Sequence, residues 1–90
     1  MLKGKIYAQS GQLLADVVNL KVRPLEVDSY EVVGLWLGQT WISPRKIKET
    51  LRLVANGAEY SAELVEYEGG KFNGSFLLRA TLISEKITDS

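Results

Sequence analysis

The chain has 90 residues and contains neither cysteine nor histidine. The lack of cysteine excludes disulfides, thiolate chemistry and cysteine-based zinc sites. The lack of histidine removes the commonest general base and the commonest ligand of transition metals. We therefore expect no metal, no cofactor and no enzymatic activity, and the missing cysteines fit a reducing compartment such as the cytoplasm.

Net charge and long apolar runs are missing as well. The 11 Lys and Arg residues balance 11 Asp and Glu residues, whereas a dedicated nucleic-acid binder usually carries a basic excess that neutralises phosphates. No apolar run approaches the roughly 18–20 residues of a membrane span, and the first residues become polar too early for a signal peptide. We therefore expect no membrane contact and do not favour nucleic acid as a partner.

The sequence does contain short alternating segments between turn signals, and its hydrophobic share is 46%. This pattern is typical of β-hairpins. Several hairpins in so short a chain predict a single all-β domain over 1–84, followed by a polar tail over 85–90. The expected architecture is a small antiparallel barrel or sandwich of about six strands, with one short helical turn near 44–49. The order of the strands stays open.

The clearest turn signal is the Asn-Gly pair at 56–57, a strong hairpin signal. Pairing residues outward from it sets Leu53 opposite Tyr60 on an apolar face and brings Arg52 near Glu59 on a charged face. A slip of one residue would destroy this separation. The sequence therefore predicts a hairpin of fixed register, with the basic and acidic stretches as cross-strand neighbours.

A second hairpin is expected at the Ser-Gly pair at 10–11. Outward pairing puts Lys5 opposite Asp16, and it places Leu13 on the same apolar face as Ile6. After Val17 the apolar residues change phase, and such a change predicts a β-bulge over 17–19. A seventh strand would result if this bulge broke the second strand in two.

A third turn is expected in the stretch LWLGQTWI, residues 35–42. A two-residue turn at the Gly-Gln pair would set Trp36 directly opposite Trp41 in a non-hydrogen-bonded pair, where side chains approach most closely. Such an aromatic pair adds about 0.5–1.5 kcal/mol to stability. The spacing of the two tryptophans therefore has a structural explanation that needs no ligand.

Ser43 and Pro44 are typical of a helix start, as N-cap and first helical residue. One interpretation extends a helix over 44–55, with the Asn-Gly pair as its C-cap. We favour a single helical turn over 44–49 followed by a strand over 50–55, because pairing across the Asn-Gly turn accounts for more residues.

A fourth turn is expected over 68–71, where two glycines follow each other. It would set Tyr67 opposite Phe72. The Asn-Gly pair at 73–74 would then form a bulge that restores the register of the last strand, 75–83.

Several of these strands carry apolar residues on both faces, although a barrel has only one inside. The surplus must be covered by loops, by the helical turn or by another chain. Association would also compensate for the limited core of a short chain, so we expect a homo-oligomer or a protein partner. The residues expected at the interface are Val18, Val32, Val54, Val65 and Leu77.

A second candidate surface combines the tryptophans with the basic stretch that follows them. Aromatic stacking beside cations is how small barrels hold single-stranded nucleic acid, and another polyanion would use the same features. The candidate ligand-binding residues are Trp36, Trp41, Arg45, Lys46, Lys48 and Arg52. The competing interpretation, a tryptophan pair beside a capped turn, is purely structural, and we favour it.

Catalytic patterns are weak in this sequence. Ser43 and Lys46 have the Ser-x-x-Lys spacing of some serine acyltransferases, but the companion motifs are missing. Glu66 and Glu68 share a strand face and could hold a cation weakly, although a solvated strand face is the simpler explanation.

The sequence alone therefore favours a non-enzymatic β-barrel module that acts as a subunit of an oligomer or of a larger assembly. The alternative is a module that binds nucleic acid or another polyanion through the two tryptophans and the basic stretch 45–52. An enzyme that relies on carboxylates, Ser43 or Lys46 ranks last.

Overall fold

A computed structural model describes residues 2–85 of the chain. Within these residues the elements are β1 (Lys3–Tyr7), β2 (Leu13–Glu26), β3 (Ser29–Gly38), the 3-10 turn η1 (Pro44–Lys46), β4 (Leu51–Ala55), β5 (Ala58–Gly69) and β6 (Asn73–Ser84). The polar tail expected over 85–90 lies outside the described residues, apart from Glu85, which follows β6 in a bend.

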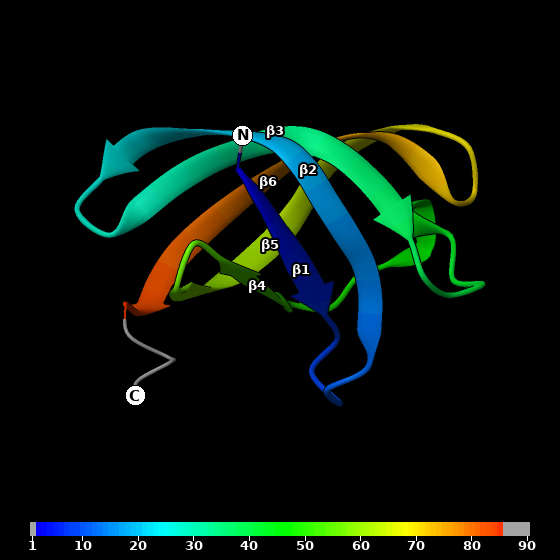
Figure 1. Cartoon of the computed structure of the whole chain (residues 1–90), viewed down its shortest axis with the longest axis horizontal. Helices are drawn as coiled ribbons and strands as arrows, with labels where there is room; N and C mark the ends of the chain where they lie inside the picture. Colours follow the sequence, from blue (N-terminus) through cyan, green and yellow to red (C-terminus); the bar gives the residue numbers. More distant parts are fainter. Residues whose placement is uncertain (1, 86–90) are drawn as a thin grey trace.

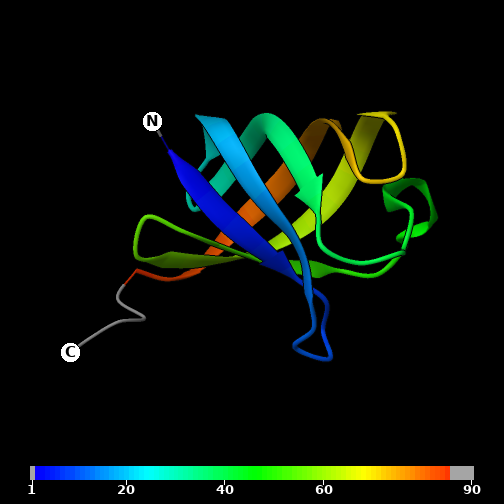
Figure 2. The ribbon, with the colours of Figure 1, turned by 45° about the vertical axis from the view of Figure 1, so that its right-hand side comes forward.

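The strands form one closed antiparallel barrel in the order β1-β2-β3-β6-β5-β4 (Figure 1). Chain neighbours pair as hairpins, except β3 and β4, which are not adjacent in the barrel. The barrel is completed by two pairings between distant segments, β3 with β6 and β1 with β4. Figure 2 shows the strands wrapping around a common interior. The predicted fold class is therefore confirmed, and the barrel is the correct one of the two architectures that the sequence allowed.

The hairpin at 56–57 is confirmed residue by residue. Leu53 lies opposite Tyr60, and Arg52 Nε donates to Glu59 Oε2 over 2.6 Å. The two turn residues have φ values of 55° and 78°, as a tight turn that matches the twist of the strands requires.

The first hairpin is confirmed except near its turn. Lys5 lies opposite Asp16, and their side chains form an ion pair of 2.7 Å. A register shift after Ile6 then sets Tyr7 opposite Leu13. Because this irregularity adds one residue to β2, Leu14 rather than Leu13 turns into the core, where it is 4% exposed.

The bulge expected over 17–19 is present in β2. Asn19 has a positive φ of 55°, and the pairing of β2 with β3 shifts between Val18 and Lys21. The extra residue turns Leu20 into the core. Beyond it, β2 continues beside β3 as a long arm past the start of β1 (Figure 1).

The predicted tryptophan hairpin is wrong. β3 ends at Gly38, and residues 39–50 form a connection to β4. The free side of β3 pairs with β6, so that Trp36 lies opposite Gly74. Its indole is 1% exposed and meets the rings of Tyr67 and Phe76 edge to face. Burying a large side chain completely is worth about 1.5–3 kcal/mol, more than a surface pair adds.

The favoured interpretation of 44–55, a turn followed by a strand, is confirmed, although the turn is shorter than expected. η1 covers three residues, closed by the bond from Ile47 N to the carbonyl of Pro44. Ser43 occupies the N-cap position, but its side chain makes no capping hydrogen bond.

The predicted register of the last hairpin is wrong. Tyr67 lies opposite Phe76 instead of Phe72, because β5 continues to Gly69, which pairs with Gly74. The two backbones approach so closely that a Cβ on Gly69 would lie 2.4 Å from the Cα of Gly74. These glycines therefore serve a close contact rather than a turn. The bulge lies at position 65 in β5, not at 73–74.

The interior of the barrel is entirely apolar, and none of the described polar or charged residues is buried there. The core cluster consists of Ile6, Leu14, Ala15, Val17, Leu20, Val32, Trp36, Leu51, Leu53, Ala62, Phe76, Leu78 and Ala80.

Candidate functional site

The outer surface of β2, β3 and β6 carries five apolar side chains that the strand register brings together. Val18 lies opposite Leu35, Val33 lies opposite Leu77, and Leu37 follows on β3. Chain neighbours of these residues are buried, namely Val17, Val32, Trp36, Phe76 and Leu78. Successive side chains of a strand point to opposite faces, so the five apolar side chains point outward on the same side. We call Val18, Val33, Leu35, Leu37 and Leu77 the apolar face.

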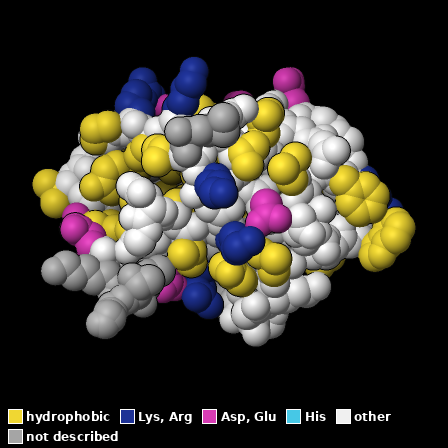
Figure 3. Space-filling view, viewed as in Figure 1, with side chains coloured by type: hydrophobic (Ala, Val, Ile, Leu, Met, Phe, Trp, Pro, Cys, Tyr) yellow, Lys and Arg dark blue, Asp and Glu magenta, His cyan; other side chains and the backbone are white. Residues whose placement is uncertain are grey.

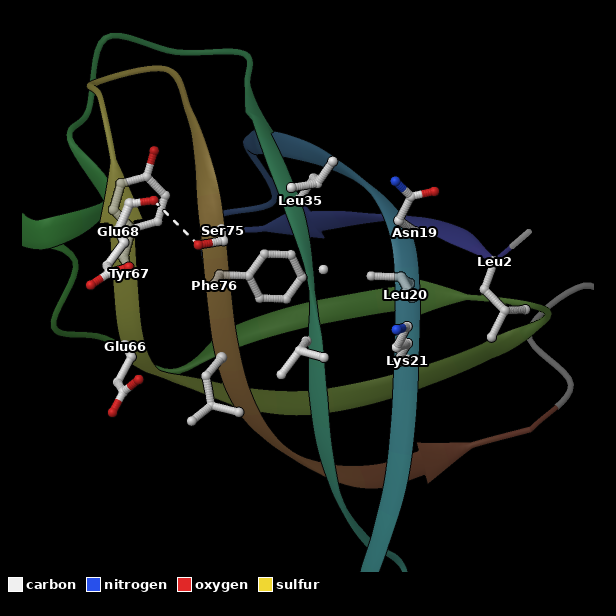
Figure 4. A pocket seen from close by; sticks show the side chains of 13 residues that line it. Leu2, Asn19, Leu20, Lys21, Leu35, Glu66, Tyr67, Glu68, Ser75 and Phe76 are labelled. Atoms are coloured by element: carbon white, nitrogen blue, oxygen red, sulfur yellow. Dashed lines mark hydrogen bonds between the residues drawn. The ribbon is translucent and has the colours of Figure 1, made fainter.

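A groove of about 780 Å³ lies on this face (Figure 4). Leu35 and Leu77 line it, together with Gly34 and two residues that belong to the core cluster, Leu20 and Phe76. A Cβ on Gly34 would lie 2.8 Å from Leu20 Cδ2 and 3.3 Å from Phe76 Cε2. The missing side chain at Gly34 therefore lets two core residues fill the space beneath the groove.

Opposite charges border the two sides of this groove. Figure 4 shows Lys21 on β2 at one side, and Glu66 and Glu68 on β5 at the other. All three side chains are exposed. The ion pairs found among residues 2–85 join other side chains, namely Lys5 to Asp16, Arg23 to Glu31 and Arg52 to Glu59. These bordering charges are therefore available to a partner.

The structure distributes the five predicted interface residues over four places, of which the core, with Val32, is the last. Val18 and Leu77 belong to the apolar face. Val54 adjoins it, because a second hollow of about 550 Å³ is lined by Val18, Leu37 and Val54. Val65 occupies the bulge of β5 and is 49% exposed.

Val32 is a wrong prediction for the interface. It lies opposite Leu78 inside the barrel and is 1% exposed. Its neighbour Val33 has the outward position instead. Two consecutive valines fit either phase of a strand, so the sequence did not decide which one is inside.

The six predicted ligand-binding residues also separate. Trp36 cannot act as a surface platform, because it is buried in the core. Arg52 lies on β4, where it pairs with Glu59 and its guanidinium stands 5.6 Å from the ring centroid of Tyr7. The remaining four, Trp41, Arg45, Lys46 and Lys48, lie on the connection over 39–50.

Trp41 is 77% exposed and meets residues of the β5–β6 turn. Its ring centroid lies 5.2 Å from that of Phe72, and Lys71 Nζ lies 5.6 Å from the indole centroid. Phe72 and Lys71 were not among the predicted site residues, because the sequence leaves the strand order open and nothing in it links these two loops. The register error at Trp36 likewise hid Val33, Leu35 and Leu37.

Arg45 anchors the connection to the end of β5. Its guanidinium stands 5.7 Å from the ring centroid of Tyr67, and Nη1 donates to the carbonyl of Gly69 over 3.2 Å. Burial raises the pKa of the Tyr67 hydroxyl, although the positive charge of Arg45 acts in the opposite direction. That hydroxyl therefore stays protonated at neutral pH and donates to the carbonyl of Gly70.

No three acidic side chains among residues 2–85 gather closely enough to hold a metal ion. No helix in the described part of the chain is long and apolar enough to cross a membrane.

Comparison of the chain with protein families, with curated proteins and with solved structures finds no significant match.

Proposed function

We propose that this chain is a non-enzymatic interaction module that binds a second copy of itself through the apolar face. The observation that carries the proposal is the register that gathers Val18, Val33, Leu35, Leu37 and Leu77 on one outer surface. Contact between apolar surfaces removes them from water, which is the main driving force of association. Leu35 is 41% exposed and lies in the middle of this face.

The bordering charges favour a second copy over an unrelated partner. In a two-fold dimer the same surface patch meets itself. With the two-fold axis running along the groove, between its two charged borders, Lys21 of each copy faces Glu66 and Glu68 of the other, because these charges lie on opposite sides of the groove (Figure 4). The face is therefore complementary to itself in charge as well as in polarity.

The free energies of ion pairing and of apolar burial indicate which residues control the affinity of the dimer. Exposed ion pairs contribute only about 0.2–1 kcal/mol each, so the charges mainly orient the two copies. Burial of a leucine or valine side chain is worth about 1.5–3 kcal/mol. The affinity should therefore depend most on Leu35 and its apolar neighbours.

Polyanion binding through the predicted aromatic and basic residues has weaker support. Only four of the six proposed residues share a surface, and the tryptophan pair on which stacking depended is absent. The loops that carry these four residues form a different surface from the apolar face.

We predict that Leu35→Glu abolishes dimerisation without unfolding the barrel, because it places a charge in the centre of the proposed interface. Sedimentation equilibrium over a concentration series measures the effect. Val27→Glu is the matched control, since Val27 is 92% exposed at the tip of the β2–β3 arm, and it should dimerise like the unmodified chain. Equal loss of association in both variants would contradict the assignment of the interface.

A further inference from the structure

Two loops meet at one end of the barrel and form a surface that the proposed dimer does not use. The connection over 39–50 meets the turn over 70–72 at the rings of Trp41 and Phe72, and the residue before the connection, Gly38, donates from its N to the carbonyl of Phe72. Figures 1 and 2 show both loops at the same end of the molecule. We call this surface the loop end, and it comprises Trp41, Ile42, Phe72, Arg45, Lys46, Lys48 and Lys71.

The loop end exposes three large hydrophobic side chains. Trp41 is 77% exposed, Ile42 46% and Phe72 37%. In Figure 3 hydrophobic side chains reach the surface at this end of the long axis, over the β3–β4 connection. A tryptophan so exposed contributes little to the core, so its exposure points to a contact outside the chain.

Cations lie on the same two loops as these apolar groups. Lys71 Nζ stands 5.6 Å from the Trp41 ring centroid, and Lys46 and Lys48 are exposed. Acidic groups lie to one side of the apolar groups, in a hollow next to η1 that Glu49, Glu63 and Glu66 line together with Arg45 and Lys48. Trp41, Phe72 and Lys71 do not line this hollow.

We propose that the loop end binds the surface of an anionic lipid bilayer. Tryptophan is enriched at membrane interfaces because its ring is apolar while its N–H can stay hydrated. Ile42 and Phe72 would enter the boundary between headgroups and acyl chains, and the four cations would pair with lipid phosphates. The sequence predicted no membrane contact because it lacks a spanning segment, but binding to a bilayer surface needs none.

The arrangement of the rings favours a bilayer over single-stranded nucleic acid. The rings of Trp41 and Phe72 are inclined at 72°, so they cannot both stack on parallel neighbouring bases, and Lys71 lies over the indole. Base stacking also gives no role to the aliphatic side chain of Ile42. Insertion into a bilayer interface requires no parallel rings.

Tryptophan fluorescence with extruded vesicles tests the proposal, because Trp36 is buried and Trp41 is the exposed reporter. Equimolar phosphatidylglycerol and phosphatidylcholine should shift the emission to shorter wavelength, and acyl chains carrying bromine should quench it. Phosphatidylcholine alone should produce a much smaller shift. No shift and no sedimentation with the anionic vesicles would overturn the proposal, as would a response to oligothymidylate but not to vesicles.

Co-sedimentation of variants with the anionic vesicles identifies the residues that bind the bilayer. Trp41→Ala should remove most of the binding, and Lys46→Gln with Lys48→Gln should weaken it roughly 25-fold, since each lost cation costs roughly fivefold. Lys3→Gln with Arg79→Gln makes the same change in net charge elsewhere and should have little effect. Leu35→Glu, which disrupts the proposed dimer, should still bind. Equal weakening by the control pair, or loss of binding in Leu35→Glu, would contradict a separate site at the loop end.

Discussion

Gly34 connects the packing of the core with the apolar face. A methyl group at this position would lie 2.8 Å from both Leu20 Cδ2 and the carbonyl oxygen of Val18. The side chain could move, but the carbonyl is backbone and belongs to the ladder between β2 and β3. Space for even one methyl group is therefore missing at the floor of the groove.

We predict that Gly34→Ala lowers the free energy of unfolding by about 1–3 kcal/mol, the usual effect of overpacking. Chemical denaturation measures it. Gly70→Ala is the control, because the nearest atom to a Cβ there is 3.9 Å away, and it should leave stability nearly unchanged. A Gly34→Ala variant as stable as the unmodified chain would show that the floor of the groove is not closely packed.

For single residues, the sequence predicts which positions are apolar, but often not whether their side chains point into or out of the barrel. Leu53 and Tyr60 were assigned correctly because a strong turn lies only a few residues away and fixes the phase of both strands. Val32 and Trp36 were assigned wrongly because no reliable turn lies near them. Their orientation depends on the pairing of β3 with β6, which are separated by about half of the chain.

At the scale of elements, turn chemistry predicted a hairpin only where glycine supplies a turn conformation. At 56–57 the positive φ values belong to the turn itself. At Gly38 and Gly69 the absence of a side chain serves close packing, since a Cβ on Gly38 would lie 2.9 Å from the carbonyl oxygen of Phe72. Both glycines were predicted to form turns, and for that reason the predicted tryptophan pair and the predicted register of the last hairpin are wrong.

The arm formed by β2 and β3 has an open edge. Leu20 N donates to the carbonyl of Leu2, but among the described strands β2 has no partner on this side beyond that bond. N–H groups point alternately to the two sides of a strand, so position 24 faces the same open edge as Leu20. Pro24 has no N–H to offer there, which protects the edge from pairing with another chain.

We predict that Pro24→Thr promotes aggregation through this edge, because it restores a backbone donor in a β-prone position. Light scattering during incubation at moderate temperature measures the effect. Leu25→Thr changes an exposed side chain of the same arm without adding a donor, and it should remain as dispersed as the unmodified chain. Equal scattering from both variants would mean that Pro24 does not protect the edge.

For the whole molecule, two long-range pairings determine both the closed barrel and the candidate sites. β3 with β6 brings Leu77 beside Val33 and completes the apolar face. The same pairing carries the β5–β6 turn to the connection over 39–50, where Phe72 meets Trp41. The hairpins at 10–11 and 56–57 follow from local signals, but the strand order depends on the total burial of the core, which local signals do not specify. The interaction surfaces were therefore less predictable than the fold class.

The most direct test of the account is sedimentation equilibrium of two charge-reversed variants, Lys21→Glu and the double variant Glu66→Lys with Glu68→Lys. In a dimer of either variant with itself, like charges face each other at both borders of the proposed interface. Each variant should therefore dimerise more weakly than the unmodified chain. In an equimolar mixture every bordering contact joins opposite charges, and a dimer of the two variants should form. A mixture that associates no better than its separate components would contradict a dimer formed through the apolar face.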